Sequence, residues 1–345
     1  MQTYEYIFAS IIVVAMLIAT TSLASITPQL YISMSDVEQM KMVAQKLMVR
    51  LLMSPGEPKD WGGNITIEAS RISSFGLATN AYFTCDAFTL DQDKVQRLNQ
   101  RLPGQLYLPP RRVLELLNID LEYGFKIEFI PVIRIEASLR SFRELLVNVT
   151  SEQGLPLIQA NVVAGAFYVS NGEIVESIAT GLTGPRGNCT INLTCPTPAL
   201  LIVAVDYYGI RAIKVIEVGD LHTGFFIGSF LITNASLSGE AYQVSIEPMN
   251  GSLSLRSIKS HLALFDGYCV SNYKLYRMAY TEPNTVVVVA TDEDGRLMAA
   301  WKGVPETYGT SSGSVLSPLA YTLERNVKIG FTAYTLKLTV WRVSW

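Results

Sequence analysis

The residue types that most often perform catalysis or bind metals are scarce in this sequence. Its 345 residues include two histidines, His222 and His261, and four cysteines. Histidine exchanges protons near neutral pH, and histidine and cysteine are the usual ligands of zinc. The sequence has no P-loop, nucleophile elbow, H-E-x-x-H or dinucleotide-binding glycine pattern. We therefore expect no enzymatic activity, no cofactor and no metal. An extracellular hydrolase, the alternative, would need a cleft with paired carboxylates.

One acidic segment has the residue types that calcium prefers. Asp292-Glu293-Asp294-Gly295 lies between two strand-like segments, 285–290 and 296–301. The remaining positions of a twelve-residue EF-hand loop are absent. We therefore predict that this segment is the turn of a β-hairpin.

The four cysteines allow three disulfide pairings. Cys189 and Cys195 are close in the sequence and could close a local hairpin disulfide, which would leave Cys85 to pair with Cys269. Free buried thiols are the alternative. The spacing does not decide the connectivity, and no Cys-x-x-Cys motif indicates zinc or redox activity.

Six Asn-x-Ser/Thr acceptors for N-linked glycans follow an apolar N-terminal segment. They lie at Asn64, Asn148, Asn188, Asn192, Asn234 and Asn250. Such acceptors are used on the surfaces of secreted proteins. We therefore expect residues beyond the apolar segment to lie outside the cell and to be glycosylated.

Composition and charge exclude two further classes of protein. Hydrophobic residues make up 49% of the chain and charged residues 17%, so the chain is not intrinsically disordered. The net charge is −3, and no run of lysine or arginine could neutralise a row of phosphates. Nucleic acid is therefore not an expected partner.

The apolar excess is concentrated near the N-terminus. No charged residue occurs from Tyr6 to Ser35, and residues 6–26 are mostly apolar. As a helix, this segment would be roughly 32 Å long, about the thickness of the hydrocarbon core of a bilayer. A cleaved secretory signal would have a basic region ahead of the apolar run, but no lysine or arginine precedes it. We therefore predict a segment that crosses a membrane once.

The helical pattern continues beyond the apolar run as an amphipathic half. Apolar residues recur at spacings of three and four, at Met34, Val37, Met40, Ala44, Leu47 and Leu51. Pro28 should kink the helix or start a new segment. The prolines and glycine of Ser54-Pro55-Gly56-Glu57-Pro58 should end it. A membrane anchor followed by a short coiled linker is the alternative.

These features together resemble a known family. A charge-free segment with glutamate at position 5, an amphipathic second half and a β-rich remainder resemble the mature form of archaeal type IV pilin-like proteins. The segment 51–61, then Phe75-Gly76-Leu77-Ala78 and Leu90-Asp91-Gln92-Asp93-Lys94-Val95, resembles the pattern LL-x-S/T-PG-x-P-x-x-W, GLA, L-D-x-x-K-V of such surface proteins. The resemblance covers about the first 100 residues.

The chain departs from this family in one respect. The precursors carry a short basic leader ahead of the apolar helix, and none is present here. Two interpretations stay open: the numbering begins at the processed N-terminus, which Glu5 favours, or Met1 is the true start and the helix is an ordinary signal anchor.

The resemblance implies that the chain polymerises with itself. It implies that Glu5 pairs with a neighbour's N-terminal amine, since a carboxylate among apolar helices is costly unless paired. Otherwise Glu5 would lie among membrane headgroups, at the positive end of the helix dipole. The expected assembly residues also include Tyr6, Ile7, Phe8, Ile11, Val14, Leu17 and Pro28.

From residue 64 onward the sequence is typical of half-buried strands separated by turns. Residues 91–101 and 110–117 are expected to be short helices, and Phe125, Ile127 and Phe129 alternate with charged residues as in a strand. Residues 141–218 contain several short strands at regular spacing, which indicates a β-sandwich. Within this stretch, 154–162 and 180–187 follow the layout G-x-P-L-x-x-A-x-V and T-G-x-T-G-x-x-G. This layout resembles carboxypeptidase-regulatory-like and other immunoglobulin-like adhesion modules, which implies spacing or contact and no chemistry.

The expected fold is therefore of the α+β class, with a long N-terminal helix and a mainly β head. We assign 1–54 to the stalk helix, 55–140 to a mixed α/β pilin-like region, 141–219 to an immunoglobulin-like sandwich and 220–345 to a C-terminal β domain. The terminal strand, 337–345, is expected to protect or close a sheet edge.

The expected function is that of a subunit of an extracellular, glycosylated type IV pilus-like filament. The subunit would be inserted in the membrane before assembly, and its head would contact a surface or another cell. The pattern does not separate adhesion from motility. The alternative is a membrane-anchored monomer, such as a surface-layer protein or a receptor ectodomain.

Overall fold

The structure is a computed structural model that describes residues 2–79, 88–119, 122–249, 252–266, 272–282, 284–310 and 320–343. Side chains are described throughout these ranges except at 2–11, 23–36, 249 and 252. The protein is mainly β, with several sheets, and the described residues include a closed barrel of seven strands. The helices within these ranges are α1 (Gln2–Met53), the 3₁₀ turn η1 (Ala69–Arg71), α2 (Gln92–Gln96) and α3 (Pro110–Leu116).

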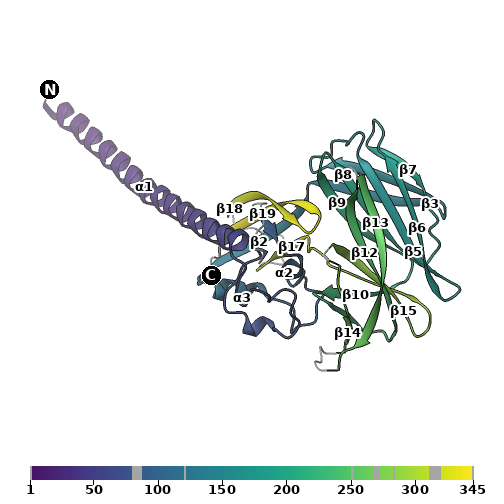
Figure 1. The fold of residues 1–345 in the computed structure, drawn as a ribbon. Coiled ribbons are helices and arrows are strands. Elements are labelled where there is room, and N and C mark those ends of the chain that lie inside the picture. Colours follow the sequence, from purple (N-terminus) through teal and green to yellow (C-terminus); the bar gives the residue numbers. More distant parts are fainter. Residues whose placement is uncertain are drawn as a thin grey trace.

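Helix α1 projects away from the rest of the molecule, with its N-terminal half standing clear of the β sheets (Figure 1). Two effects were expected of Pro28, a kink or the start of a new segment; the helix continues through this residue, so the new segment does not occur. Proline has no N–H to donate to the carbonyl of Ala24, and the helix continues around that missing bond. The C-terminal half of α1 packs against the β head.

The predicted amphipathic face of α1 is confirmed. Met40, Ala44, Leu47 and Leu51 are buried. Val37 is an exception, because 38% of its surface is exposed. The buried face packs on a sheet of strand order β1-β18-β19-β2-β17 and contacts β18 and β19. These strands are β1 (Thr89–Leu90), β2 (Tyr123–Pro131), β17 (Thr307–Gly309), β18 (Ala320–Ile329) and β19 (Thr332–Arg342).

Strand β2 has the alternation that its sequence predicts. Phe125, Ile127 and Phe129 are buried in the core beneath α1. The terminal strand differs from the expectation, because β19 lies in the middle of the sheet and pairs with β18 on one side and β2 on the other. It therefore does not protect an edge. An alternating strand fits an edge or a centre equally well, so its sequence could not decide the position.

The chain leaves this sheet after β2, builds two further β units and returns at β17. The first unit has two sheets, β3-β4-β7 and β6-β5-β8-β9, which share one core formed by Val147, Ala164 and Val203 among others. Its strands are β3 (Ile133–Ser141), β4 (Glu144–Ser151), β5 (Asn161–Ser170), β6 (Glu173–Leu182), β7 (Asn188–Asn192), β8 (Ala199–Tyr207) and β9 (Ile210–Val218).

The second unit is the barrel, with strand order β10-β11-β14-β13-β12-β15-β16. It closes because β10 pairs in parallel with β16. The predicted hairpin turn after Asp292 joins β15 to β16, and Gly295 has the positive φ of +75° that such turns need. The strands are β10 (His222–Ile227), β11 (Phe230–Thr233), β12 (Leu237–Met249), β13 (Ser252–Leu264), β14 (Lys274–Met278), β15 (Thr285–Asp292) and β16 (Leu297–Trp301).

Strand β8 is buried on both faces, which explains its unbroken apolar sequence. Leu201 and Val203 point into the core shared with β3-β4-β7. Leu200 and Ile202 point the other way and pack against barrel residues such as Val287. Covering both faces removes the alternation expected of a half-exposed strand. The two β units therefore share a continuous apolar contact.

The strand pairing groups the sequence into units whose bounds differ from those of the expected domains. The stretch 220–345 contains both the barrel strands, within 222–301, and β18 and β19, which belong to the sheet on α1. Likewise β3, all but the last residue of which lies in the expected region 55–140, pairs with β4. Strand partners far apart in the chain leave no local signal in the sequence, so the insertion between β2 and β17 could not be read from composition.

Candidate assembly surface on helix α1

The middle of the projecting half of α1 exposes apolar side chains on every side. All residues from Ile12 to Ser22 are exposed. The large side chains keep from 50% to 67% of their surface accessible, and they are Ile12, Val13, Val14, Met16, Leu17 and Ile18. Because a helical turn has 3.6 residues, these consecutive positions cover the whole circumference. A helix that is apolar all round is stable only in apolar surroundings, so this segment requires a cover.

The hydroxyl groups of this segment are already hydrogen-bonded within the helix. Thr20 Oγ1 donates to the Met16 carbonyl at 2.9 Å, and Thr21 Oγ1 donates to the Leu17 carbonyl at 2.8 Å. Such back-bonding lets threonine enter apolar surroundings without an unsatisfied donor. The exposed segment is therefore compatible with burial along its length.

The predicted assembly residues are distributed over the projecting half. Val14 and Leu17 are exposed, 55% and 58% respectively. The other predicted residues lie on the helical backbone of α1, but their side chains are outside the described set: Glu5, Tyr6, Ile7, Phe8, Ile11 and Pro28. The pairing role of Glu5 stays a prediction.

Among the residues with described side chains, which leave out 2–11 and 23–36 of α1, no helical stretch is long and apolar enough to cross a membrane.

An apolar stripe that the sequence analysis missed lies on the outward face of the C-terminal half of α1. Met42, Val49 and Met53 are 62%, 59% and 67% exposed. Their spacing of seven and four places them on one side of the helix, opposite the face that packs on the head. We call these three residues the outer stripe. The spacing of these three residues is visible in the sequence, but the apolar pattern of the buried face is longer and stronger.

The end of α1 is held by the residues that gave the family resemblance. We call the segments 54–78 and 90–97 the collar. The Leu77 N–H donates to the Leu51 carbonyl at 3.0 Å, and the Ala78 N–H donates to the Ser54 carbonyl at 3.0 Å. These bonds satisfy carbonyl groups that the end of a helix leaves without partners.

Two glycines of the collar are required by close backbone contact. Gly56 has a φ of +74°, and a Cβ there would lie 2.7 Å from the Ser74 carbonyl oxygen. A Cβ on Gly76 would overlap the Ser54 carbonyl oxygen. Glycine is the residue that allows both approaches. The PG and GLA parts of the pattern therefore serve the folding of the collar.

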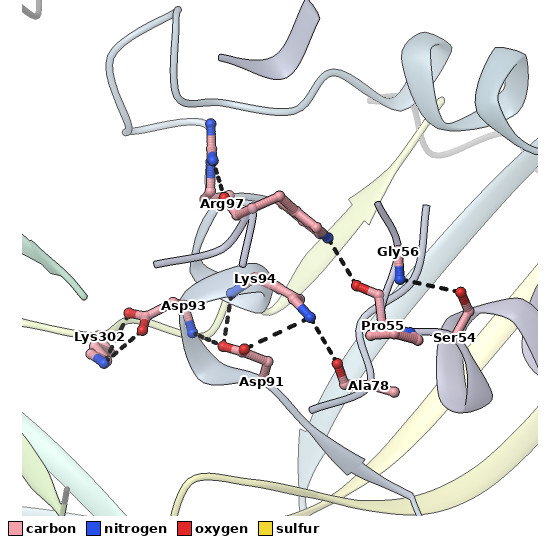
Figure 2. Close-up of polar contacts among 10 residues, drawn as sticks. Ser54, Pro55, Gly56, Ala78, Asp91, Asp93, Lys94, Arg97 and Lys302 are labelled. Atoms are coloured by element: carbon pink, nitrogen blue, oxygen red, sulfur yellow. Dashed lines mark hydrogen bonds and ion pairs between the residues drawn. The ribbon is translucent and has the colours of Figure 1, made fainter. Parts of the chain in front are cut away.

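Lys94 is a fully buried cation within the collar. Its Nζ donates to the Ala78 carbonyl at 2.9 Å and lies 3.8 Å from Asp91 Oδ2 (Figure 2). Asp91 also caps α2 by accepting from the Asp93 N–H at 2.9 Å. Burial raises the pKa of Asp91 and lowers the pKa of Lys94. The pair joins the start of α2 to the GLA segment.

Arg97 holds the loops around Trp61. It is buried, and its guanidinium group donates to the carbonyls of Leu106, Trp61 and Ile67. The guanidinium carbon lies 5.6 Å from the centre of the Trp61 ring, and Trp61 Nε1 donates to the Pro55 carbonyl at 3.2 Å. The buried cations of the collar thus bind backbone carbonyls of the loops that follow α1.

The described glycan acceptors are at least partly accessible. Asn188, Asn192 and Asn234 are exposed, and Asn64 and Asn148 are partly exposed. Asn250 lies outside the described residues.

The predicted disulfide between Cys189 and Cys195 is not formed in the structure. Both thiols are free and buried in the core between β3-β4-β7 and β6-β5-β8-β9. Burial raises the pKa of each thiol, so each behaves as a small apolar side chain. Cys85 and Cys269, the other predicted pair, lie outside the described residues.

The acidic turn after Asp292 does not form a recognisable metal site. Among the described residues, no group of three or more histidine, cysteine, aspartate or glutamate side chains could hold a metal ion. The Asp292 carboxylate instead accepts from the Arg296 N–H at 2.7 Å within the turn and lies 3.4 Å from His222 Nε2.

Comparison with known proteins found no family model and no curated protein that matches this chain.

Proposed function

We propose that this chain is a structural subunit of an extracellular type IV pilus-like filament, assembled through its N-terminal helices. The observation that carries the proposal is the exposed apolar segment of α1, residues 12–18, on a helix whose other half is fixed to a β head. The head does not bury this segment, so other molecules must bury it.

Polymerisation would bury the exposed apolar segment. Burying one large apolar side chain contributes roughly 1.5–3 kcal/mol, so the single chain leaves much favourable burial unrealised. Before assembly, lipid would surround the segment. On extraction, equivalent helices of neighbouring copies would replace the lipid, and identical head-to-tail contacts that do not close would generate a helical fibre.

The outer stripe favours assembly over a simple membrane anchor. Met42, Val49 and Met53 lie in the half of α1 that is packed on the head. An anchor has no use for exposed apolar side chains at this level, whereas a filament has neighbouring helices along the whole of α1. Glu5, by the family resemblance, would pair with a neighbour's N-terminal amine and fix the axial register.

The head would cover the outside of the fibre. We interpret β3–β9 as an immunoglobulin-like sandwich, because two antiparallel sheets share one core and the sequence resembles such adhesion modules. Figure 1 places this unit and the barrel on the far side of the head from the N-terminus of α1. That placement fits a role in contact with another surface or cell, and accessible glycan acceptors fit an extracellular location.

Fractionation of the native organism tests this proposal. Surface appendages are sheared from cells, collected by ultracentrifugation and examined by electron microscopy with antibodies against the head. We expect the chain in fibres decorated by the antibody. Recovery of the chain only as single molecules in the membrane fraction would support the membrane-anchored alternative and overturn the filament proposal.

A further inference from the structure

Three of the glycan acceptors lie on one face of the sheet β3-β4-β7. In β4, Leu145, Val147 and Val149 point into the core, so Asn148 and Thr150 point to the opposite face. In β7, Cys189 and Ile191 are buried, whereas Asn188, Thr190 and Asn192 are exposed. The asparagines and the hydroxyl residues at 150 and 190 therefore share the outer face.

The register places two of these asparagines side by side. Asn148 is directly opposite Asn188 in the antiparallel pair of β4 and β7, and Asn192 is opposite Glu144. We call Asn148, Asn188 and Asn192 the acceptor face. The strands β3 and β7 lie at the edge of the molecule farthest from α1 (Figure 1). An enzyme that modifies the folded head would therefore reach this face without obstruction from the helix.

We propose that the acceptor face carries N-linked glycans and that only one of Asn148 and Asn188 is modified in any one molecule. A glycan on either asparagine blocks modification of the other. The donor is a lipid-linked oligosaccharide activated by phosphate. A bond forms between Nδ2 of asparagine and C1 of the first sugar, while the C1–O bond to the lipid phosphate breaks. The lipid phosphate leaves with the electron pair, and one Nδ2 proton is released.

The competition follows from the spacing of the sheet. Directly opposite residues of antiparallel strands have Cβ atoms about 5 Å apart, which is comparable to the width of a sugar ring. A glycan on one asparagine therefore covers the amide of the other. Asn192 is four residues from Asn188, about 13 Å along the strand, so it is modified independently.

This inference needs the head to be outside the cell but does not need the filament. The competition also requires that transfer occurs on the folded sheet, because Asn148 and Asn188 are far apart in an unfolded chain. Glycans at this edge would keep the sheet β3-β4-β7 solvated, which leaves the barrel for contacts with partners.

Mass spectrometry of the full-length protein from its native host tests the inference. A protease that cleaves after lysine releases residues 127–214 in one piece, because no lysine lies between Lys126 and Lys214. In a Thr194→Ala background, which removes the Asn192 acceptor, the mass of this fragment counts the glycans on Asn148 and Asn188 together. We expect fragments with one glycan and none with two.

Two variants in this background identify the competition directly. Asn148→Gln should raise the occupancy of Asn188 to the sum of the two occupancies in the parent protein. Thr150→Ala removes the same acceptor without changing the asparagine and should do the same. Asn234→Gln, at an exposed acceptor in another part of the head, is the matched control and should leave Asn188 unchanged.

Two results would overturn the inference: fragments with two glycans at the frequency expected for independent sites, or no glycan at either position. Neither result depends on fibres. If the chain is recovered as membrane-bound monomers with one glycan on fragment 127–214, the filament proposal is wrong and this inference is supported.

Discussion

Lys302 Nζ lies 2.9 Å from Asp93 Oδ1, although the two residues are 209 positions apart in the chain. Asp93 belongs to α2 in the collar, and Lys302 follows the last barrel strand. The same carboxylate accepts from the Gly228 N–H at 3.2 Å, in the turn between β10 and β11. One side chain therefore fixes the barrel to the collar at two points, and Figure 2 shows the contact with Lys302.

Removal of the cation from this contact should destabilise the protein. Lys302 and Asp93 are 14% and 15% exposed, so Lys302→Met leaves a mostly buried carboxylate without its cation. We expect a loss of about 1–3 kcal/mol in the free energy of unfolding, measured by urea denaturation. Lys259 pairs with Glu240 at 2.7 Å on the exposed barrel surface, so Lys259→Met is the control and should not move the midpoint. If Lys302→Met, like the control, leaves the free energy of unfolding unchanged, the contact contributes nothing to stability.

The buried face of α1 should contribute strongly to the stability of the head. Leu51 is fully buried, so Leu51→Ala should cost about 2–5 kcal/mol through lost burial and a cavity. Val49, two residues away, is 59% exposed, and Val49→Ala should change the free energy of unfolding by less than about 0.5 kcal/mol. Thermal or chemical denaturation of detergent-solubilised protein measures both. If the two variants lose equal stability, α1 does not pack on the head in solution.

The stability of the head should fall at alkaline pH through Tyr308. This residue is buried and donates to the Leu108 carbonyl at 2.8 Å, and burial raises the pKa of its phenol well above the usual value of 10.0. The folded state therefore holds this proton more tightly than the unfolded state. The resulting stability is complete below pH 10 and is lost as the pH rises toward the folded pKa.

Tyr308→Phe isolates this effect. The variant should be less stable at pH 7, by about 1 kcal/mol, because the Leu108 carbonyl loses its donor. Its stability should then decline less steeply than that of the wild type above pH 10. Urea denaturation from pH 7 to 11 measures both curves. Parallel curves over the whole range would contradict a raised pKa at Tyr308.

The thiols of Cys189 and Cys195 should be unreactive in the folded protein. Both are buried, and burial raises the pKa of each, so little thiolate is available. We expect iodoacetamide to label them only after denaturation. Both residues lie in the tryptic peptide 187–211, so the label is counted in one fragment. A peptide two hydrogens lighter would instead show the disulfide.

Glu5→Ala tests the role that the family resemblance gives to this carboxylate. The head should fold and leave the cell, because Glu5 lies far from the collar along α1. Fibre yield should fall, since a neighbour's amine would lose its partner. Electron microscopy and quantitative blotting of the sheared fraction measure the yield. Normal yield in the variant would remove Glu5 from the assembly mechanism.

Local patterns in the sequence predicted the local elements well. The alternation of Phe125, Ile127 and Phe129 identified β2, and the proline at the start of α3 identified that helix. The helix predicted for 91–101 is shorter, because α2 ends at Gln96 and the Arg97 carbonyl accepts from the Leu108 N–H in the next loop. Such a tertiary bond has no counterpart in the local sequence.

Long-range pairing could not be predicted. β19 pairs with β2 across the whole insertion, and the barrel closes through the parallel pair of β10 and β16. Both depend on contacts between distant segments that one sequence does not encode in its composition. On α1, the buried face was strong enough to predict, whereas the outer stripe of Met42, Val49 and Met53 became visible only when the packed side of the helix was known.

In the proposed filament, residues 12–18 of α1 are buried among copies of the same helix. Electron cryomicroscopy of fibres sheared from the native organism, at a resolution that shows side chains, tests it most directly. We predict a core of α1 helices in which Val14 and Leu17 contact neighbouring copies, with the β head outside. A fibre core built from any other element, or preparations in which this chain occurs only as single molecules in membranes, would contradict it.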